Sequence, residues 1–318
     1  MKMKSNDSTV VSGHAEPRLS ASRKRRTLMH HMCNVIMQLK QLGKERTSET
    51  YLSALNSFML FRHGRDIQLN RLSADIMQQY EAWLKERGLS MNTSSFYMRI
   101  LRASYNRAVE RRITKQLNPF RHVYTGIGKT VKRAVGLKEI KLIKELDLSG
   151  NPSLDYARDM FLFSFYTRGM SFIDMAYLRK TDLKNGILCY RRRKTRQTLY
   201  VKWEKCMQRI IDKYPPNDTI YLLPIITRHG RDRQQYQNAL RLINGKLKKV
   251  AVMAGMKARL TMYVSRHSWA SIAHAKHIPL SIISEGMGHD NEATTQIYLT
   301  SLDTSAIDRA NELIIKSL

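Results

Sequence analysis

Between residues 35 and 114, apolar side chains recur every three or four positions, which is the spacing of helix faces rather than of strands. In the first of these helices they fall on a single face, as packing against a core requires. That face consists of Tyr51, Leu55, Phe58 and Met59. Ser73 has the position of an N-cap for a second helix that stops at Gly88, and a third helix starts at Asn92. The stretch therefore predicts a small helical bundle.

Residues 136–303 combine short helices with one hairpin. Helices are expected at residues 136–145, 155–166 and 235–254. A capping box from Ser171 to Asp174 opens another helix. Residues 187–201 alternate in polarity on either side of a turn at 194–197, which is typical of a β-hairpin. The predicted fold is mainly α with a small β-sheet, and the second half of the chain is an α+β domain.

A basic stretch at residues 117–135, with one proline and two glycines, separates the two halves and has the composition of a linker. Residues 1–22 are polar, and the run Arg23–Arg26 follows them, so a disordered basic arm is expected ahead of the bundle. The expected organisation is an arm at 1–34, a helical domain at 35–116, the linker at 117–135, a second domain at 136–303 and a C-terminal helix at 304–318.

The chain carries 55 Lys and Arg residues against 26 Asp and Glu residues, a formal net charge of +29. Such an excess repels itself and is usually neutralised by a polyanion, nucleic acid first and an acidic membrane surface second. The longest apolar run, residues 160–166, is far too short to span a bilayer, and residues 1–22 do not resemble a signal peptide. No membrane association is therefore expected.

Metal and disulfide chemistry have little support in the sequence. Cys33, Cys189 and Cys206 lack the spacing of metal ligands or of a disulfide framework, which fits a reducing cytosol. The histidines at 267, 274 and 277 have no matching cysteine or acidic partner and are expected on helix surfaces. Neither a metal nor a cofactor is expected.

The third helix of the bundle carries a basic face. Arginines that a DNA backbone could contact there are Arg99, Arg102 and Arg107, continued by Arg111 and Arg112. The hairpin adds a second basic segment, in which Arg193 and Arg196 flank the turn. Basic faces of this kind indicate phosphate contacts.

Residues 286–298 contain His289 nine positions before Tyr298, after a turn that includes two glycines. Alone, such a pair would be a capped helix followed by a packed tyrosine. Upstream, however, Arg266 and His267 enter an apolar helix, and the basic hairpin precedes them. An arginine fork, an imidazole and a phenol are the groups that attack on a phosphodiester requires.

In this order, basic hairpin, Arg-His-Ser-Trp-Ala, Gly-His and tyrosine, the chain resembles the tyrosine recombinases of the phage-integrase family over roughly residues 35 to 300. The resemblance implies a helical core-binding domain followed by a catalytic domain. It makes Tyr298 the nucleophile that forms a 3′-phosphotyrosyl link, without ATP or metal. It also implies that Arg266 clamps the phosphate, that His289 binds the phosphate or assists proton movement, and that Lys194 protonates the leaving 5′ oxygen.

Two positions depart from the family pattern. Tyr263 stands three residues before Arg266, where the family has histidine or lysine, so one proton-transfer role is in doubt. Ser171 stands three residues before Asp174, where the family has its first arginine. Either Ser171 only caps a helix and Arg168 is a solvated turn residue, or Arg168 reaches back as the second clamp. Arg193 or Arg196 of the hairpin could also replace the missing arginine.

The resemblance extends to short integrases and invertases of mobile or phase-variable elements. It implies double-stranded DNA with paired recombination sites as the substrate, a homo-oligomer from dimer to tetramer on that DNA, and an accessory DNA-bending protein as a further possible partner. The helix at 304–318 is expected to dock on a neighbouring copy or on its own domain. A cytoplasmic, nucleoid-associated location follows. The alternatives are a type IB topoisomerase and a DNA-binding protein without catalysis.

Overall fold

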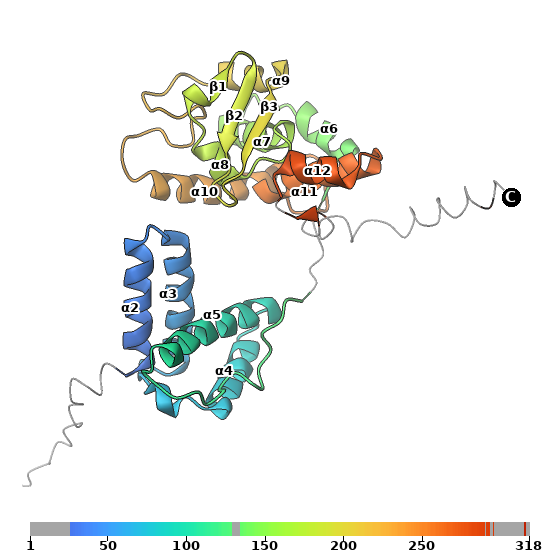
Figure 1. The fold of residues 1–318 in the computed structure, drawn as a ribbon. Coiled ribbons are helices and arrows are strands. Elements are labelled where there is room, and N and C mark those ends of the chain that lie inside the picture. Colours follow the sequence, from blue (N-terminus) through green and yellow to red (C-terminus); the bar gives the residue numbers. More distant parts are fainter. Residues whose placement is uncertain (1–25, 129–133, 290, 293–294, 296–314, 316–318) are drawn as a thin grey trace, which may run out of the picture. The chain divides into compact units, whose positions relative to one another are not determined.

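The chain folds into two compact units, residues 1–130 and 131–318, shown in a computed structural model (Figure 1). The structure describes residues 26–128, 134–289, 291–292, 295 and 315. Tyr298, residues 1–25 of the expected arm and, apart from Ile315, the expected helix at 304–318 lie outside the described residues.

The first unit is the predicted helical bundle. Its elements are α2 (Leu28–Gln41), α3 (Glu45–Phe61), the short 3-10 helix η1 (Leu69–Arg71), α4 (Ala74–Glu86) and α5 (Met91–Glu110). Ser73 caps α4 by accepting the backbone N–H of Ile76, as the sequence predicts. The N-cap of α5 is Ser90, which accepts the N–H of Thr93, so this helix starts one residue before the predicted Asn92.

The core of this unit forms where α3, α4 and α5 meet, around aromatic side chains. Phe58 and Tyr80 are fully buried with their rings perpendicular, 5.1 Å between centroids. The hydroxyl of Tyr80 donates to Ser57 at 2.7 Å, so the buried phenol keeps a polar partner. The predicted apolar face of α3 is confirmed in Tyr51, Leu55 and Phe58, which are all buried.

The boundary expected at residue 35 falls inside α2, which begins at Leu28. Leu28 and Met32, which precede residue 35, are buried. The polar pair His30–His31 stands between them, so their helical spacing is not evident in the sequence. His31 is itself buried and its Nε2 donates to the backbone carbonyl of Ser104 at 3.0 Å. Burial lowers the pKa of this imidazole, which keeps it neutral inside the bundle.

Much of the predicted linker is held against α5. The side-chain amide of Asn92 donates to the carbonyl of Gly128 at 3.0 Å and accepts its N–H at 2.7 Å. The hydroxyl of Ser95 donates to the carbonyl of Gly126, and Arg102 donates to Thr125. Residues up to 128 therefore belong to the first unit, and the expected boundary at 117 lies too early.

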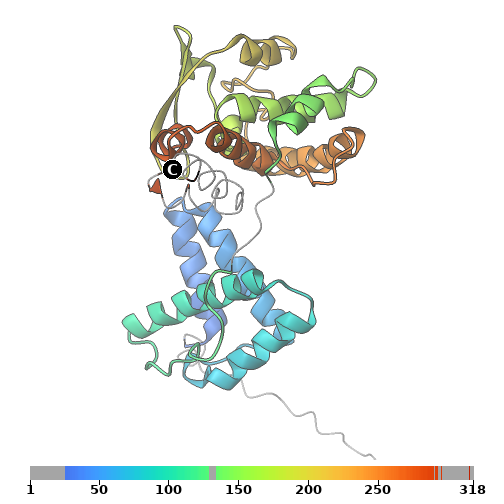
Figure 2. The ribbon, with the colours of Figure 1, turned by 90° about the vertical axis from the view of Figure 1, so that its right-hand side faces the viewer.

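The second unit places a three-stranded sheet beside a group of helices (Figures 1 and 2). Its helices are α6 (Leu137–Glu145), α7 (Pro152–Tyr166), α8 (Phe172–Ala176), the 3-10 helix η2 (Lys180–Asp182), α9 (Lys205–Asp212), α10 (Asp232–Met253), α11 (Met262–Ala275) and α12 (Leu280–Met287). The strands β1 (Leu183–Lys184), β2 (Ile187–Arg191) and β3 (Thr198–Lys202) pair antiparallel in the order β1-β2-β3. The fold is thus mainly α with a small sheet, as predicted.

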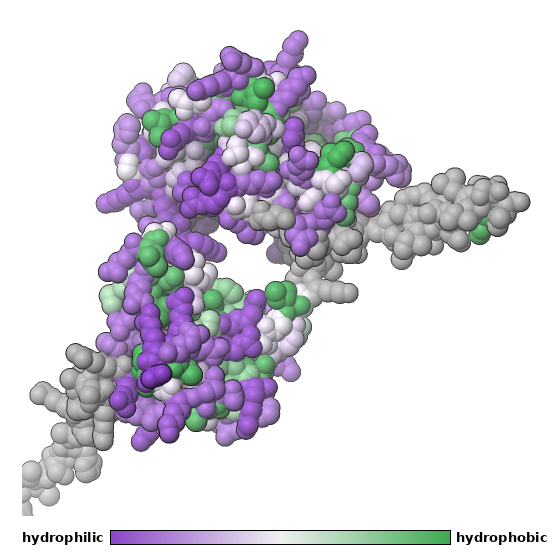
Figure 3. Space-filling model, in the orientation of Figure 1, coloured by the Kyte–Doolittle hydropathy of each residue, from purple (hydrophilic) through white to green (hydrophobic). Residues whose placement is uncertain are grey.

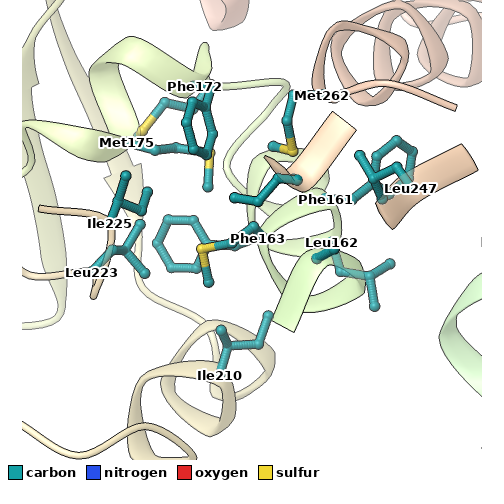
Figure 4. Close-up of a cluster of buried hydrophobic side chains, with 14 of the residues drawn as sticks. Phe161, Leu162, Phe163, Phe172, Met175, Ile210, Leu223, Ile225, Leu247 and Met262 are labelled. Carbon is teal, nitrogen blue, oxygen red and sulfur yellow. The ribbon is translucent and has the colours of Figure 1, made fainter. Parts of the chain in front are cut away.

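Helix α7 is the centre of this unit, because α6, α9, α10 and α11 all pack against it. Its side chains Phe161 and Phe163 are fully buried, and Figure 4 shows Phe163 among Ile210, Leu223 and Ile225. The hairpin alternates as predicted, because Leu188 and Tyr190 of β2 and Leu199 and Val201 of β3 face the core.

Two local predictions need correction. Helix α10 begins at Asp232, three residues before the expected start at Gln235. The expected Gly-Met-Gly turn is also wrong, because Gly286 and Met287 complete α12 and only Gly288, with a φ of +65°, takes the left-handed conformation that ends the helix.

The visible surface is predominantly hydrophilic (Figure 3), consistent with the charged composition. Within the described residues, no helix is both long and apolar enough to cross a membrane.

Candidate active site

Arg266 is the buried centre of a polar cluster in the second unit. It lies in the second turn of α11 and is 4 % exposed. Its guanidinium donates to the carbonyl of Gly169 and to the carbonyl of Met287, each at 2.7 Å. Carbonyl groups at helix ends lack partners within the helix. The turn between α7 and α8 and the end of α12 therefore supply acceptors that offset the cost of burying this charge.

Gly169 makes this approach possible. A Cβ atom added at residue 169 would stand 2.7 Å from the Cα of Arg266, and the φ of Gly169 is +72°. Both the limited space and the backbone angle thus require glycine here.

His289 is held between Arg266 and Thr295. The guanidinium of Arg266 lies 2.9 Å from Nε2 of His289, and Nδ1 lies 2.7 Å from the hydroxyl oxygen of Thr295. A guanidinium can only donate, so Nε2 must accept and the ring proton must be on Nδ1. The imidazole is therefore neutral, with its proton pointing to Thr295, which is fully buried.

The charges around His289 favour this neutral form. Burial, followed by the charges of Arg266, Arg192 and Lys194, lowers the pKa of His289 to about 4. Desolvation and like charge both disfavour an imidazolium. Three positive charges therefore act on a neutral imidazole, which is an arrangement suited to an anion.

Arg192 is the second buried arginine of the cluster. It is 5 % exposed, donates to the carbonyl of Gly288, and places its Nε 3.8 Å from a carboxylate oxygen of Asp174. A Cβ at residue 288 would stand 2.7 Å from the Cδ of Arg192. Gly288 is therefore needed for close contact as well as for its backbone angle.

Asp174 connects helix α8 to the hairpin. Its carboxylate accepts the hydroxyl of Ser171 at 2.6 Å and the backbone N–H of Arg193 at 2.9 Å. Ser171 also caps α8 by accepting the N–H of Asp174, which confirms the predicted cap. Ser171 thus has a structural role, and Arg192 is a buried arginine that lies beside its partner Asp174.

Other predicted residues of the catalytic unit lie around this cluster. Lys194 is exposed in the hairpin turn, yet its charge is among those that lower the pKa of His289. Arg168 is half-buried with a φ of +61°, and its side chain makes no hydrogen bond or ion pair with another described residue. Tyr263 is 53 % exposed, and its ring stands perpendicular to the imidazole of His267 at 4.5 Å. His267 is buried, so its expected surface position is wrong.

The predicted DNA-contacting arginines differ in exposure. Arg193 and Arg196 are exposed on the hairpin, and Arg193 stacks on the ring of Tyr177 at 3.9 Å. On α5, Arg102 is exposed, whereas Arg99 and Arg107 are half-buried. Arg111 and Arg112, just after α5, are exposed.

Two residues of the site were not predicted from the sequence. Arg192 continues the alternation of Leu188 and Tyr190, so its position predicts an inward-facing side chain, and a charged residue at such a position is a signal for a site. Thr295 gives no such signal within a run of small polar residues. Among the described residues, no group of histidine, cysteine and acidic side chains could hold a metal.

Both units of the chain match known protein families. Residues 27–125 match the family model of the phage integrase SAM-like domain, and residues 142–305 match that of the phage integrase family. A tyrosine recombinase of Pseudothermotoga lettingae is 21% identical over 303 residues, which cover 90% of this chain and 98% of the relative. Tyrosine recombinase XerC of Bacillus licheniformis is 24% identical over 277 residues, 82% of this chain and 88% of the relative.

Solved structures share the fold at low identity. A lambda integrase fragment of residues 75–356, crystallised as a dimer bound to a core site, superposes with a TM-score of 0.67 at 13% identity, covering 88% of this chain and 97% of that one. The integrase of transposon Tn1549, in complex with a circular intermediate DNA, gives 0.65 at 15% identity, covering 92% and 100%.

A helical bundle followed by a catalytic unit with a buried arginine–histidine cluster defines a tyrosine-type site-specific DNA recombinase. Because the catalytic family model alone spans more than half of the residues, the chain belongs to the phage integrase family.

Proposed function

We propose that this protein cuts and rejoins duplex DNA at two paired sites, with Tyr298 as the nucleophile. The observation that carries the proposal is the contact of the buried Arg266 with the neutral imidazole of His289, next to the buried Arg192 that donates to the carbonyl of Gly288. Preorganised cations of this kind stabilise the charge that develops on a phosphodiester under attack.

The steps exchange a phosphodiester bond of the DNA for a phosphotyrosyl bond and back again, so no external source of energy is needed. The phenol oxygen of Tyr298 attacks phosphorus, and the bond from phosphorus to the 5′ oxygen breaks. The phenolic proton passes to Nε2 of His289 as the guanidinium of Arg266 turns from this nitrogen to the phosphate, and the 5′ oxygen takes a proton from Lys194. Attack of a 5′ hydroxyl from the partner strand on the phosphotyrosine reverses both proton transfers.

Arg192 is the second phosphate clamp in this scheme. It is buried beside Gly288 and Asp174, and its charge acts on His289, whereas the charge of Arg168 is not among those that shift that pKa. The roles of Arg168 and Tyr263 stay predictions. Tyr263 carries no positive charge, and its ring faces His267.

The catalytic proposal is tested with Tyr298→Phe on a duplex that carries the recombination site with a nick beside the cleaved phosphate, so that the cleaved end diffuses away and the adduct accumulates. The wild type is expected to form a covalent protein–DNA adduct, and the variant is expected to bind the same duplex without forming one. An adduct in the variant would place the nucleophile elsewhere. No adduct in the wild type would favour a DNA-binding protein without catalysis.

The assembly is proposed by analogy with the structural neighbours. Lambda integrase has been crystallised as a dimer on a core site and as a tetramer on a Holliday junction. A dimer to tetramer on paired sites, acting in integration, excision or inversion, with an accessory bending protein and a cytoplasmic, nucleoid-associated location, fits this class. Joining of two labelled duplexes separates it from a type IB topoisomerase, which acts on one.

The segment 304–318 is proposed to dock on a neighbouring copy. Its residues Ile307, Leu313 and Ile314 share one side of a helical pattern, which needs an apolar partner. Deleting residues 305–318 should leave binding to one site intact and abolish pairing of two sites in native gel electrophoresis. A truncated protein that recombines at the full-length rate would exclude docking on a neighbour.

A further inference from the structure

A cavity of about 360 Å³ lies between the hairpin and the segment from α8 to η2. This volume is within the range of small-ligand sites. Its walls include the side chains of Tyr177, Arg179, Tyr190, Arg191, Arg193 and Arg196. We refer to it as the arginine pocket.

The arginine pocket has an excess of positive charge. Arg192 also lines it, so five arginines face two carboxylates, those of Asp174 and Asp182. Both carboxylates already accept backbone N–H groups, Asp174 from Arg193 and Asp182 from Arg179. Among the described residues, no carboxylate lies within 4 Å of the other four guanidinium groups, 179, 191, 193 and 196.

Like charges gathered at a concave surface repel one another, and low-dielectric walls strengthen that repulsion. The arrangement is therefore costly for the empty protein and becomes favourable when an anion enters.

Two contacts hold the guanidinium groups in place while leaving donors available. The guanidinium carbon of Arg193 lies over the ring of Tyr177, 3.9 Å from its centroid, and a guanidinium held over a ring keeps N–H groups for other partners. Arg191 donates its Nε to the carbonyl of Arg196 at 2.8 Å, and this bond crosses the base of the turn. A guanidinium fixed in this way loses little side-chain entropy when it binds a ligand.

Arg192 connects the arginine pocket to the active-site cluster. Its NH1 donates to Gly288 on the side of His289, while its side chain also forms part of the wall of the arginine pocket. Its Nε makes no hydrogen bond among the described residues, although Asp174 lies 3.8 Å away. An anion in the arginine pocket is therefore one side chain away from the catalytic cluster.

We propose that the arginine pocket binds one phosphate group, separate from the phosphate that is cleaved. The planar forks of Arg179 and Arg193 match two oxygens each of a phosphate, and the tyrosine walls accept an attached sugar. Two sources have this chemistry, a backbone phosphate of the DNA substrate and a free phosphorylated compound. The first source rests on the proposed function.

The test compares Arg179→Gln, Arg193→Gln and their double variant with Arg209→Gln, which removes an exposed arginine of α9 outside the arginine pocket. Arg179 lies outside the hairpin, so its loss leaves the turn that carries Lys194 unchanged. One arm measures binding to a short duplex as a function of salt. The other measures binding of inorganic phosphate by calorimetry.

A DNA phosphate in the arginine pocket predicts that each single variant lowers the slope of log K against log salt by about 0.9, the value for one phosphate contact. The double variant should lose no more than either single variant, because both arginines serve the same phosphate. Binding of one inorganic phosphate per chain, lost in these variants while the DNA slopes stay unchanged, assigns the site to a free phosphorylated compound.

Two outcomes overturn the proposal. In the first, the pocket variants match Arg209→Gln in both arms. In the second, the double variant loses about twice the slope of each single variant, as independent surface contacts would. Adduct formation on the nicked duplex is measured in the same preparations. An adduct together with unaltered slopes and no phosphate binding removes the arginine pocket and leaves the recombinase function standing. If no adduct forms but the pocket variants alter the slopes, the recombinase function is excluded and the arginine pocket remains a phosphate site.

Discussion

Arg266 donates a hydrogen bond to Nε2 of His289, and this one contact sets the protonation state of the site. The ring proton must be on Nδ1, where Thr295 accepts it. Because Thr295 lies three residues before Tyr298, the histidine is bonded to the segment that leads to the proposed nucleophile. The imidazole is thus held neutral and in one orientation.

The first prediction concerns acid stability. In the unfolded chain the histidine pKa is near 6.5, and in the folded protein that of His289 is about 4. Between these values the unfolded chain binds a proton that the folded protein does not, so stability is full above pH 6.5 and falls as the pH is lowered towards 4.

Urea unfolding from pH 7 to pH 4 measures this effect. The free energy of unfolding should fall less steeply for His289→Gln than for the wild type or for His274→Gln, which changes an exposed histidine of α11. The buried His31 acts in the same direction in all three proteins and cancels in the comparison. Parallel curves for His289→Gln and the wild type would contradict the neutral, buried state of this ring.

The second prediction ranks two arginines. Arg192→Gln should slow adduct formation on the order of a hundredfold, as for the loss of other preorganised donors to a transition state. Arg168→Gln should cost much less, because the side chain of Arg168 is half-buried and makes no hydrogen bond or ion pair with another described residue, whereas Arg192 is buried and donates to Gly288. Single-turnover cleavage of a nicked duplex measures both. If Arg168→Gln proved the slower variant, the sequence-based assignment of the second clamp to Arg168 would stand instead.

The third prediction identifies the acid. Lys194→Ala should slow cleavage of an ordinary duplex, because the 5′ oxygen then leaves without a proton. A substrate with sulfur at the bridging 5′ position should restore the rate, since a thiolate needs no proton to leave. Lys184→Ala, which removes an exposed lysine of β1, serves as the control for lost charge. A defect that sulfur does not rescue would make Lys194 a DNA contact only.

The fourth prediction separates two costs at Gly169. Alanine at a positive φ costs about 1–2 kcal/mol, and overpacking adds about 1–3 kcal/mol. Gly186 has a similar φ of +73°, but no atom lies within 4 Å of the place a Cβ would take there, so Gly186→Ala carries the first cost alone. Chemical denaturation should therefore find Gly169→Ala the less stable variant, with impaired cleavage as well. Equal stabilities would mean that Arg266 can move away from residue 169.

Local rules predicted much of the fold. The N-cap at Ser73, the N-cap at Ser171 and the alternation along β2 each depend on residues close in sequence, and each is confirmed. Where a buried polar residue interrupts an apolar pattern, as His31 does in α2, the predicted start of the helix came too late. The periodicity could not show that this histidine had a carbonyl partner 73 residues away.

The site was predicted less completely, because its geometry depends on contacts between distant elements. Arg266 and His289 were named from their order along the chain, and the structure brings their side chains together. The partnership of Arg192 with Gly288 joins residues 96 apart and has no counterpart in local sequence. The position of Tyr298 lies outside the described residues, and its role stays a prediction.

The bonds of Asn92 and Ser95 to residues 126 and 128 have a practical consequence for protein engineering. A chimaera that exchanges the first unit between recombinases has to choose a crossover point. A junction at residue 117 would separate both side chains from their backbone partners and replace a fitted segment with a foreign one. A junction placed after Gly128 keeps both side chains and their backbone partners in the segment from one parent protein. Domain exchange should therefore use this later junction.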